Sequence, residues 1–272
     1  MKFLLCLSLS LIALFAEDKG CFVDENSQNI IFVKDGETKS LGLKEKIYKD
    51  QRCAYDESSF YVANLNNEIV KVASEKEFLF ALPNVGCKVS NILLDKEKIY
   101  VACDMANVVT IAIFDKSSKK FISKNFNNVY KISSFLPLGE GVFFTSFNGK
   151  AFLLDSKLNA KEQKSVGFAP VSACKFSDDE IFIGFRNGEI LDLKSGAKKQ
   201  VLRSKISALA CVGDEVLVAG EDGAIYKFDK SFKLKGKKEL FSGEIKEIFI
   251  DKNVLVGVDL GNKTKSLEIN LF

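Results

Sequence analysis

The sequence predicts an all-β protein built as a single β-propeller of four-stranded blades. A triplet rich in β-branched and aromatic residues recurs seven times, at intervals of 35 to 43 residues, and a second strand-like run and tight turns follow it. A period near 40 residues with strands and turns in every unit is typical of a propeller. The triplets span residues 21–23, 60–62, 99–101, 142–144, 181–183, 216–218 and 254–256.

The first sixteen residues differ from the rest of the chain. Met1 and Lys2 precede an apolar run that ends at Ala16, immediately before Glu17. A basic start, a short apolar core and a small residue at the end predict a secretory signal. A membrane anchor is the alternative, but about 20 apolar residues are needed to span a bilayer. We expect a signal peptide over residues 1–16, a propeller domain over 17–272, and a periplasmic protein without a transmembrane span.

The strand and turn pattern of one blade is clearest in the fifth and sixth units of the sequence. In the fifth unit, strand-like runs at 171–176, 180–184, 189–193 and 199–202 are separated by turn residues. The sixth unit repeats this pattern over residues 206–240. Asn187-Gly188 and Asp222-Gly223 mark the central hairpins, since both residue pairs favour tight turns. Four short strands per unit are what one propeller blade requires.

The two terminal units are shorter than the others. The first begins at its second strand, near Cys21, and the last offers three strands before Phe272. Either seven blades with incomplete terminal sheets meet at the seam, or six blades form, one of them assembled from both termini. The seven triplets favour seven blades over six.

Six of the seven cysteines lie in the predicted mature chain. An exported protein with an even number of cysteines can form disulfides. Because most of them lie inside strand patterns, they could equally be buried thiols that pack as small apolar residues. The best candidate disulfide joins Cys87 and Cys103, because a hairpin of strands 88–94 and 98–102 brings both residues to its open end.

Three segments carry a resemblance to known repeats. In residues 143–155, 181–192 and 216–229 an apolar strand ends in a turn with a glycine, and a second apolar strand ends near an aspartate. This pattern resembles WD40-like and quinoprotein-like repeats over nearly the whole mature chain. The exported size, the single propeller and a composition rich in Lys, Phe, Ile and Asn together resemble the NapL group of periplasmic propellers. That resemblance implies a role in the maturation of nitrate reductase or in its electron supply.

Composition argues against catalysis. The chain contains no histidine, which removes the commonest general base and the commonest metal ligand. It has no Cys-x-x-Cys motif and no glycine-rich phosphate loop. It also lacks tryptophan and adjacent cysteines, so we do not expect the activity of the quinoprotein enzymes whose repeats it resembles. Acids at 177–180 and 221–222 offer oxygen ligands for Ca²⁺, but hairpin turns explain them better. We expect no enzyme activity, no cofactor and no metal.

A protein partner is therefore the expected ligand. A net charge of only +3 is too small to indicate nucleic-acid binding. Phe147, Phe185 and Arg186 lie beside hairpin turns and form a candidate contact rim, since aromatic residues and arginine dominate binding hot spots. Packing between blades is the alternative for both phenylalanines. We expect a monomeric, non-enzymatic scaffold or accessory factor; an outer-membrane assembly scaffold and a quinone- or metal-binding redox protein are the alternatives.

Overall fold

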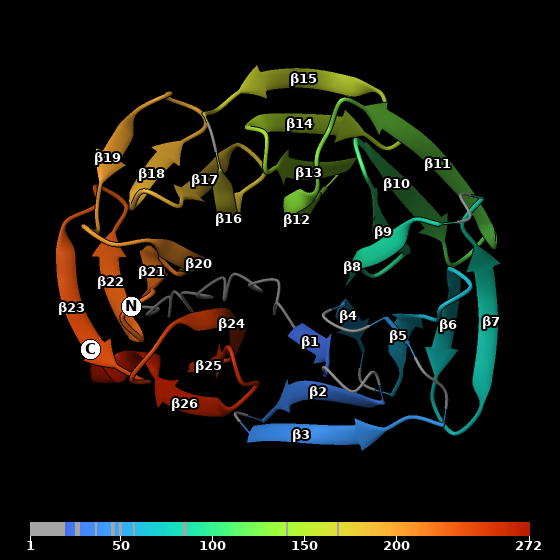
Figure 1. Ribbon diagram of the computed structural model, residues 1–272, viewed down its shortest axis with the longest axis horizontal. Helices are drawn as coiled ribbons and strands as arrows, with labels where there is room; N and C mark the ends of the chain where they lie inside the picture. Colours follow the sequence, from blue (N-terminus) through green and yellow to red (C-terminus); the bar gives the residue numbers. More distant parts are fainter. Residues whose placement is uncertain are drawn as a thin grey trace, which may run out of the picture.

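The computed structural model describes residues 20–272, except 25–27, 36, 45–46, 49–50, 57, 84–85, 140 and 168. The predicted signal peptide and its cleavage site lie outside these residues. Strands dominate the described chain, and the one helix there is a single 3₁₀ turn, Ile269–Leu271. The strands are arranged around a ring in the order of the sequence (Figure 1).

The strands fall into groups of consecutive antiparallel neighbours, four strands in each inner group and three in each terminal group. The first groups contain β1 (Gly20–Val23), β2 (Asn29–Lys34), β3 (Glu37–Gly42); β4 (Arg52–Tyr55), β5 (Phe60–Ala63), β6 (Glu68–Val72), β7 (Lys76–Ala81); and β8 (Lys88–Leu94), β9 (Lys98–Met105), β10 (Val108–Asp115), β11 (Lys120–Asn127). Then come β12 (Ile132–Leu138), β13 (Gly141–Ser146), β14 (Lys150–Asp155), β15 (Ala160–Ser165); and β16 (Pro170–Ser177), β17 (Glu180–Phe185), β18 (Glu189–Asp192), β19 (Lys198–Gln200). The last groups are β20 (Ile206–Val212), β21 (Glu215–Gly220), β22 (Ala224–Asp229), β23 (Leu234–Glu239); and β24 (Ile245–Asp251), β25 (Val254–Asp259), β26 (Thr264–Glu268).

Hydrogen bonding also connects the first three groups to one another. Strand β1 pairs with β4 of the next group, and β4 pairs in parallel with β8, so strands β1 to β11 form one sheet. The later groups form separate sheets. The number of blades therefore stays a prediction.

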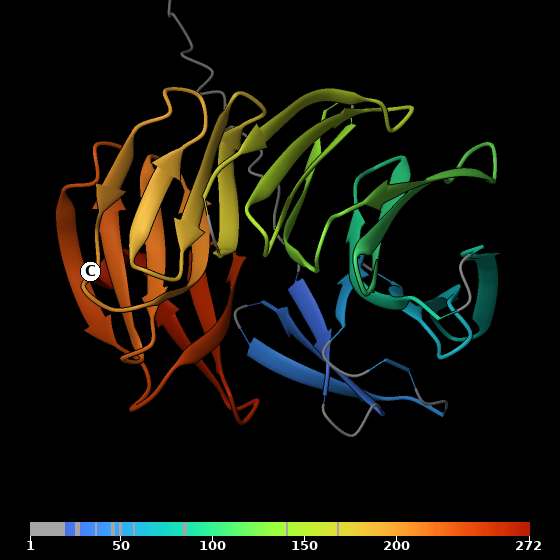
Figure 2. The same cartoon turned by 45° about the horizontal axis from the view of Figure 1, so that its top comes forward.

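Burial decreases from the centre of the ring to its outside. All six residues of β13 are buried, whereas the outer strands β15 and β19 are almost entirely exposed. The inner strands are apolar because sheets of neighbouring groups cover both of their faces. The outer strands carry lysines, which discourage edge-to-edge aggregation. Figure 2 shows the sheets standing side by side along the ring.

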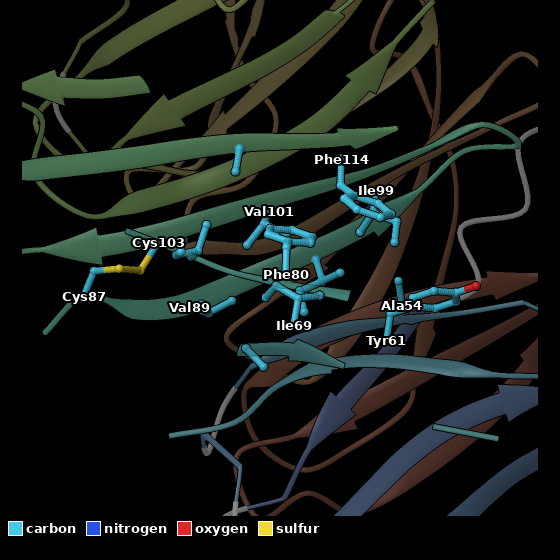
Figure 3. Packing of buried hydrophobic residues seen from close by; sticks show 14 residues of the cluster. Ala54, Tyr61, Ile69, Phe80, Cys87, Val89, Ile99, Val101, Cys103 and Phe114 are labelled. Carbon is cyan, nitrogen blue, oxygen red and sulfur yellow. A yellow bond between two sulfur atoms is a disulfide. The ribbon is translucent and has the colours of Figure 1, made fainter. Parts of the chain in front are cut away.

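Apolar side chains from neighbouring groups interlock between the sheets. Between the groups β4–β7 and β8–β11, the rings of Phe80 and Phe114 stack with their centres 5.0 Å apart, next to the fully buried Ile69 and Val101 (Figure 3). Full burial of one such side chain contributes roughly 1.5–3 kcal/mol. These contacts hold each group against the next and fix where the connecting turns emerge.

A capped turn recurs after the third strand of four successive groups. The Oδ1 atoms of Asp115, Asp155, Asp192 and Asp229 each accept the backbone N–H two residues ahead, at 2.9 to 3.0 Å. An aspartate can bond its own turn in this way. The Ser117 hydroxyl and the backbone of Ser118 lower the pKa of Asp115 to about 2. The Asn159 backbone N–H and the Ser231 hydroxyl likewise lower the pKa values of Asp155 and Asp229.

These turns should make stability depend on pH in acid. An ordinary aspartate has a pKa near about 3.9 in the unfolded chain. Because the folded pKa values are lower, their stabilisation is complete above the unfolded pKa and is lost as pH falls through the folded values. The melting temperature should therefore drop between about pH 4 and about pH 2. In the triple variant Asp115→Asn, Asp155→Asn, Asp229→Asn, the melting temperature should decrease less over this pH range than in the parent protein.

Exposed acids that cap no turn provide the control for this measurement. Glu37, Glu97 and Asp179 are exposed, and their side chains make no hydrogen bond to the described residues. A variant with glutamine or asparagine at these three positions should keep the acid-induced drop of the parent protein. An equally steep drop in the turn variant would contradict the role assigned to the turns.

Candidate protein-binding face

Two kinds of connection emerge at the same end of the ring. In each four-stranded group successive strands alternate in direction, so the hairpin between the second and third strands shares one end with the connectors to the neighbouring groups. Backbone hydrogen bonds join them: Phe147 N donates to Lys131 O at 3.0 Å, and Arg186 N donates to Ala169 O at 3.1 Å. We call this end, formed by the second-to-third hairpins and the connectors, the tip face.

The tip hairpins repeat the same backbone geometry. Gly149, Gly188 and Gly223 have φ values of 78°, 86° and 78°, a region that favours glycine, as the Asn-Gly and Asp-Gly signals predict. A Cβ atom at Gly188 would also collide with the carbonyl oxygen of Leu202. Phe147, Arg186 and Glu221 each lie two residues before one of these glycines and are therefore equivalent.

The structure separates the three predicted rim residues. Arg186 is exposed at its hairpin tip, and Phe147 is half-buried, with the Lys131 Nζ atom 5.7 Å from its ring centre. Phe185 is only 2 % exposed and packs in the core with Ile183 and Leu191. The prediction that Phe185 is an exposed anchor is therefore wrong. The contact role of Phe147 and Arg186 stays a prediction.

The error at Phe185 comes from the alignment of two turns. Phe185 is the last residue of β17 and lies three residues before Gly188, so its counterpart in the preceding group is Ser146 rather than Phe147. Ser146 is fully buried as well. Counting back from each glycine in the sequence would have assigned Phe185 to the strand.

The tip face carries large exposed apolar residues that the sequence did not single out. Leu65 is 53 % exposed in the β5–β6 hairpin, and Leu260 is 59 % exposed in the β25–β26 hairpin. Met105, at the β9–β10 hairpin, is 37 % exposed. Tyr130, 52 % exposed, follows Val129, whose N–H bonds Asn107 O at the same hairpin. Several apolar side chains thus point into solvent at one end of the ring.

The opposite end of the ring has a different surface. Within the described chain, no large exposed apolar residue lies in the turns that join first to second strands or third to fourth strands. Those turns carry charged and small residues instead, such as Asp95, Lys96 and Glu97. The other large exposed apolar residues are on outer strands or at the C-terminus: Leu41, Phe78, Phe121, Ile122, Leu234 and Leu271. The two ends are therefore chemically distinct.

Two aspartates of the tip face, Asp104 and Asp222, accept hydrogen bonds from neighbouring residues. Burial raises the pKa of Asp104, although its Oδ1 accepts the Ile132 N–H at 2.9 Å. Burial also opposes ionisation of Asp222, but hydrogen bonds from the Tyr226 hydroxyl, at 2.6 Å, and from Ala224 N outweigh it and lower the pKa. These aspartates therefore stabilise a connector and a hairpin of the tip face.

The predicted pair Cys87 and Cys103 forms a disulfide in the structure, with Cα atoms 5.7 Å apart (Figure 3). Two further disulfides join different groups: Cys21 to Cys53, and Cys174 to Cys211. Cys174 lies on β16 and Cys211 on β20, the first strands of successive groups. Their positions in the repeat differ by one residue, so the two side chains point towards each other. The sequence could not show this without the strand register.

Three of the acids considered for Ca²⁺, Asp178, Glu180 and Asp222, have protein partners. Asp178 accepts hydrogen bonds from Gly139 N and from Lys175 Nζ, at 2.5 and 2.7 Å. No group of three or more acidic, cysteine or histidine side chains is placed to hold a metal among the described residues. The same part of the chain contains no helix with the length and apolar character needed to cross a membrane.

Solved structures share this fold. The WD40 β-propeller domain of Doa1 matches with a TM-score of 0.67 and 12% identity, covering 92% of this chain and 93% of that domain. BBS1N, solved in complex with ARL6DN, matches with a TM-score of 0.72 and 13% identity over 92% and 86% of the two chains. The computationally designed protein Ika8 matches with a TM-score of 0.63 and 13% identity over 89% and 81%.

The fold is a β-propeller. The predictions of an all-β protein and of a propeller are therefore confirmed, and the WD40-like character of the repeats agrees with the Doa1 match. No family model and no curated protein sequence matches the chain. At 12% to 13% identity the structural matches establish the fold alone.

Proposed function

We propose that this protein is a non-enzymatic periplasmic β-propeller that binds a protein partner through its tip face. The observation that carries the proposal is the set of exposed apolar residues at this end, Leu65, Met105, Tyr130 and Leu260, compared with the polar turns opposite. Exposed apolar side chains gathered on one surface, with polar neighbours, are characteristic of protein interaction sites. BBS1N, which has the same fold, was solved in complex with ARL6DN.

The proposed cellular context rests on other features. Three disulfides favour an oxidising compartment such as the periplasm. The resemblance to NapL-type propellers makes subunits of periplasmic nitrate reductase the partners we propose, in maturation or electron supply. We also propose seven blades, one for each strand group, with the two three-stranded groups meeting at the seam.

A capture experiment with matched variants tests the binding face. The tip variant Leu65→Ser, Tyr130→Ser, Leu260→Ser should recover at least tenfold less partner from the native periplasm than the parent protein, since loss of hot-spot residues costs more than about 1.4 kcal/mol in total. The control variant Leu41→Ser, Phe78→Ser, Leu234→Ser removes exposed apolar residues from outer strands only. It should recover the partner as the parent protein does, with quantitative mass spectrometry as the readout.

The identity of the captured protein decides the context. Nitrate reductase subunits that are lost with the tip variant would support both parts of the proposal. Capture of outer-membrane assembly components would contradict the proposed role with nitrate reductase, but it would still support binding through the tip face. A partner that the tip variant retains and the control loses would contradict the assigned face. A coloured quinone or a stoichiometric metal in the purified protein would contradict a non-enzymatic scaffold.

A further inference from the structure

An open groove runs down the outside of the ring between two neighbouring strand groups. It consists of two hollows of about 520 and 480 Å³ that meet at Gly167 and Lys198. One end reaches Arg186 at the tip face, and the other reaches Ser195 in the turn after β18. The groove thus runs from the tip face towards the turn after β18, beside the outer strands β15 and β19.

A short outer strand accounts for the groove. Strand β19 contains three residues, whereas β15, the outer strand of the preceding group, contains six. A three-residue strand cannot cover the whole flank of the sheet beside it. Val166, Phe185 and Leu191, all buried in the same core cluster, form the apolar floor of the hollows.

Three of the four cations that line this groove have no matching acid in the described chain. Arg186, Lys194 and Lys198 have no carboxylate partner among the residues that the structure describes. The Lys198 Nζ atom lies 4.8 Å from the ring centre of Phe185, directly above the floor. Lys164 is the exception, since its Nζ atom pairs with Glu162 at 3.0 Å. The one acid in the lining, Glu189, accepts a hydrogen bond from Asn187.

Some lysines elsewhere on the ring form ion pairs, unlike those three cations of the groove. Lys205, just before β20, forms an ion pair with Glu244, just before β24. Lys230 pairs with Glu180 at 3.0 Å and lies 3.4 Å from Asp214. These two lysines therefore have carboxylate partners within the protein, whereas Arg186, Lys194 and Lys198 have none among the described residues.

We propose that the groove binds an extended acidic segment of a polypeptide partner. The inference rests on the proposed function, because the segment belongs to the protein that docks on the adjoining tip face. The cations stand at the tip end, the middle and the far end of the groove, so a row of carboxylates along a chain can meet them all. A single small anion would meet only one of these positions. Apolar side chains between the acids would contact the floor.

Fluorescence anisotropy with a labelled peptide tests this proposal. The probe alternates glutamate and valine and is about ten residues long, since an extended chain spans about 3.3 Å per residue. It should bind the mature protein, and high salt should weaken the complex because charge pairs at an open surface are screened. The variant Arg186→Gln, Lys198→Gln should bind about fivefold more weakly. The control Lys39→Gln, Lys120→Gln removes the same charge from exposed positions on β3 and β11 and should bind as the parent does.

Every other outcome overturns the groove assignment. Equal weakening in both variants would mean non-specific attraction to positive charge. Displacement of the peptide by equimolar inorganic phosphate would mean a small-anion site. Absence of peptide binding would contradict the groove as a ligand site, without affecting the result of the capture experiment at the tip face. Loss of capture with the control apolar variant instead of the tip variant would remove the proposed function, whatever the peptide does.

Discussion

Replacing Phe185 with alanine should lower the free energy of unfolding by about 3–5 kcal/mol, the usual cost of deleting a buried aromatic ring. The side chain is 2 % exposed and packs against Ile183 and Leu191, and the Lys198 ammonium covers its ring. Alanine would leave a cavity at the junction of two strand groups. Urea denaturation followed by circular dichroism measures the loss.

Phe147→Ala is the matched control for this variant. Phe147 lies one residue beyond the strand, is half-buried and belongs to no buried apolar cluster of the described chain. Its replacement should cost less than half as much as that of Phe185. Equal costs for the two variants would contradict the distinction between a strand residue and a tip residue.

The variant Cys174→Ala, Cys211→Ala should lose about 4 kcal/mol of stability. This disulfide closes a loop of sequence separation 37 and joins the inner strands β16 and β20 of successive groups. A bridge of that span restricts the unfolded chain, and its removal restores the lost entropy. The urea midpoint of the oxidised variant should therefore lie well below that of the oxidised parent.

Reduction provides the control for the disulfide. With a thiol reductant present throughout, the parent and the variant both lack all three disulfides, so their urea midpoints should coincide. Oxidised parent and variant that unfold at the same urea concentration would contradict the stabilising role of Cys174–Cys211.

The features that the sequence predicted depend on local pattern. The triplets at 181–183 and 216–218 lie inside β17 and β21, and the glycines at 188 and 223 take the positive φ that their turn signals require. The Cys87–Cys103 pairing needed only one hairpin, whose first strand spans Lys88–Leu94 as expected. Each of these inferences uses residues close together in the chain.

The features that the sequence did not reveal depend on relations between distant strands. Cys174 and Cys211 face each other only because two inner strands pack side by side. In the sequence Leu65 and Leu260 cannot be told from core leucines. Their exposure follows from their place in a hairpin, which requires knowing where the preceding strand ends. Phe185 was misassigned by a one-residue error, which moved a buried strand residue to a hairpin tip.

Hydrogen–deuterium exchange of the captured complex tests the central claim most directly. If the partner binds the tip face, amides in residues 64–67, 105–107, 129–131, 147–149, 186–188 and 260–262 should exchange more slowly in the complex than in the free protein. The turns at 95–97, 178–179 and 213–214, at the opposite end, should exchange equally in both. Protection of those turns, with unchanged exchange at the tips, would contradict the account.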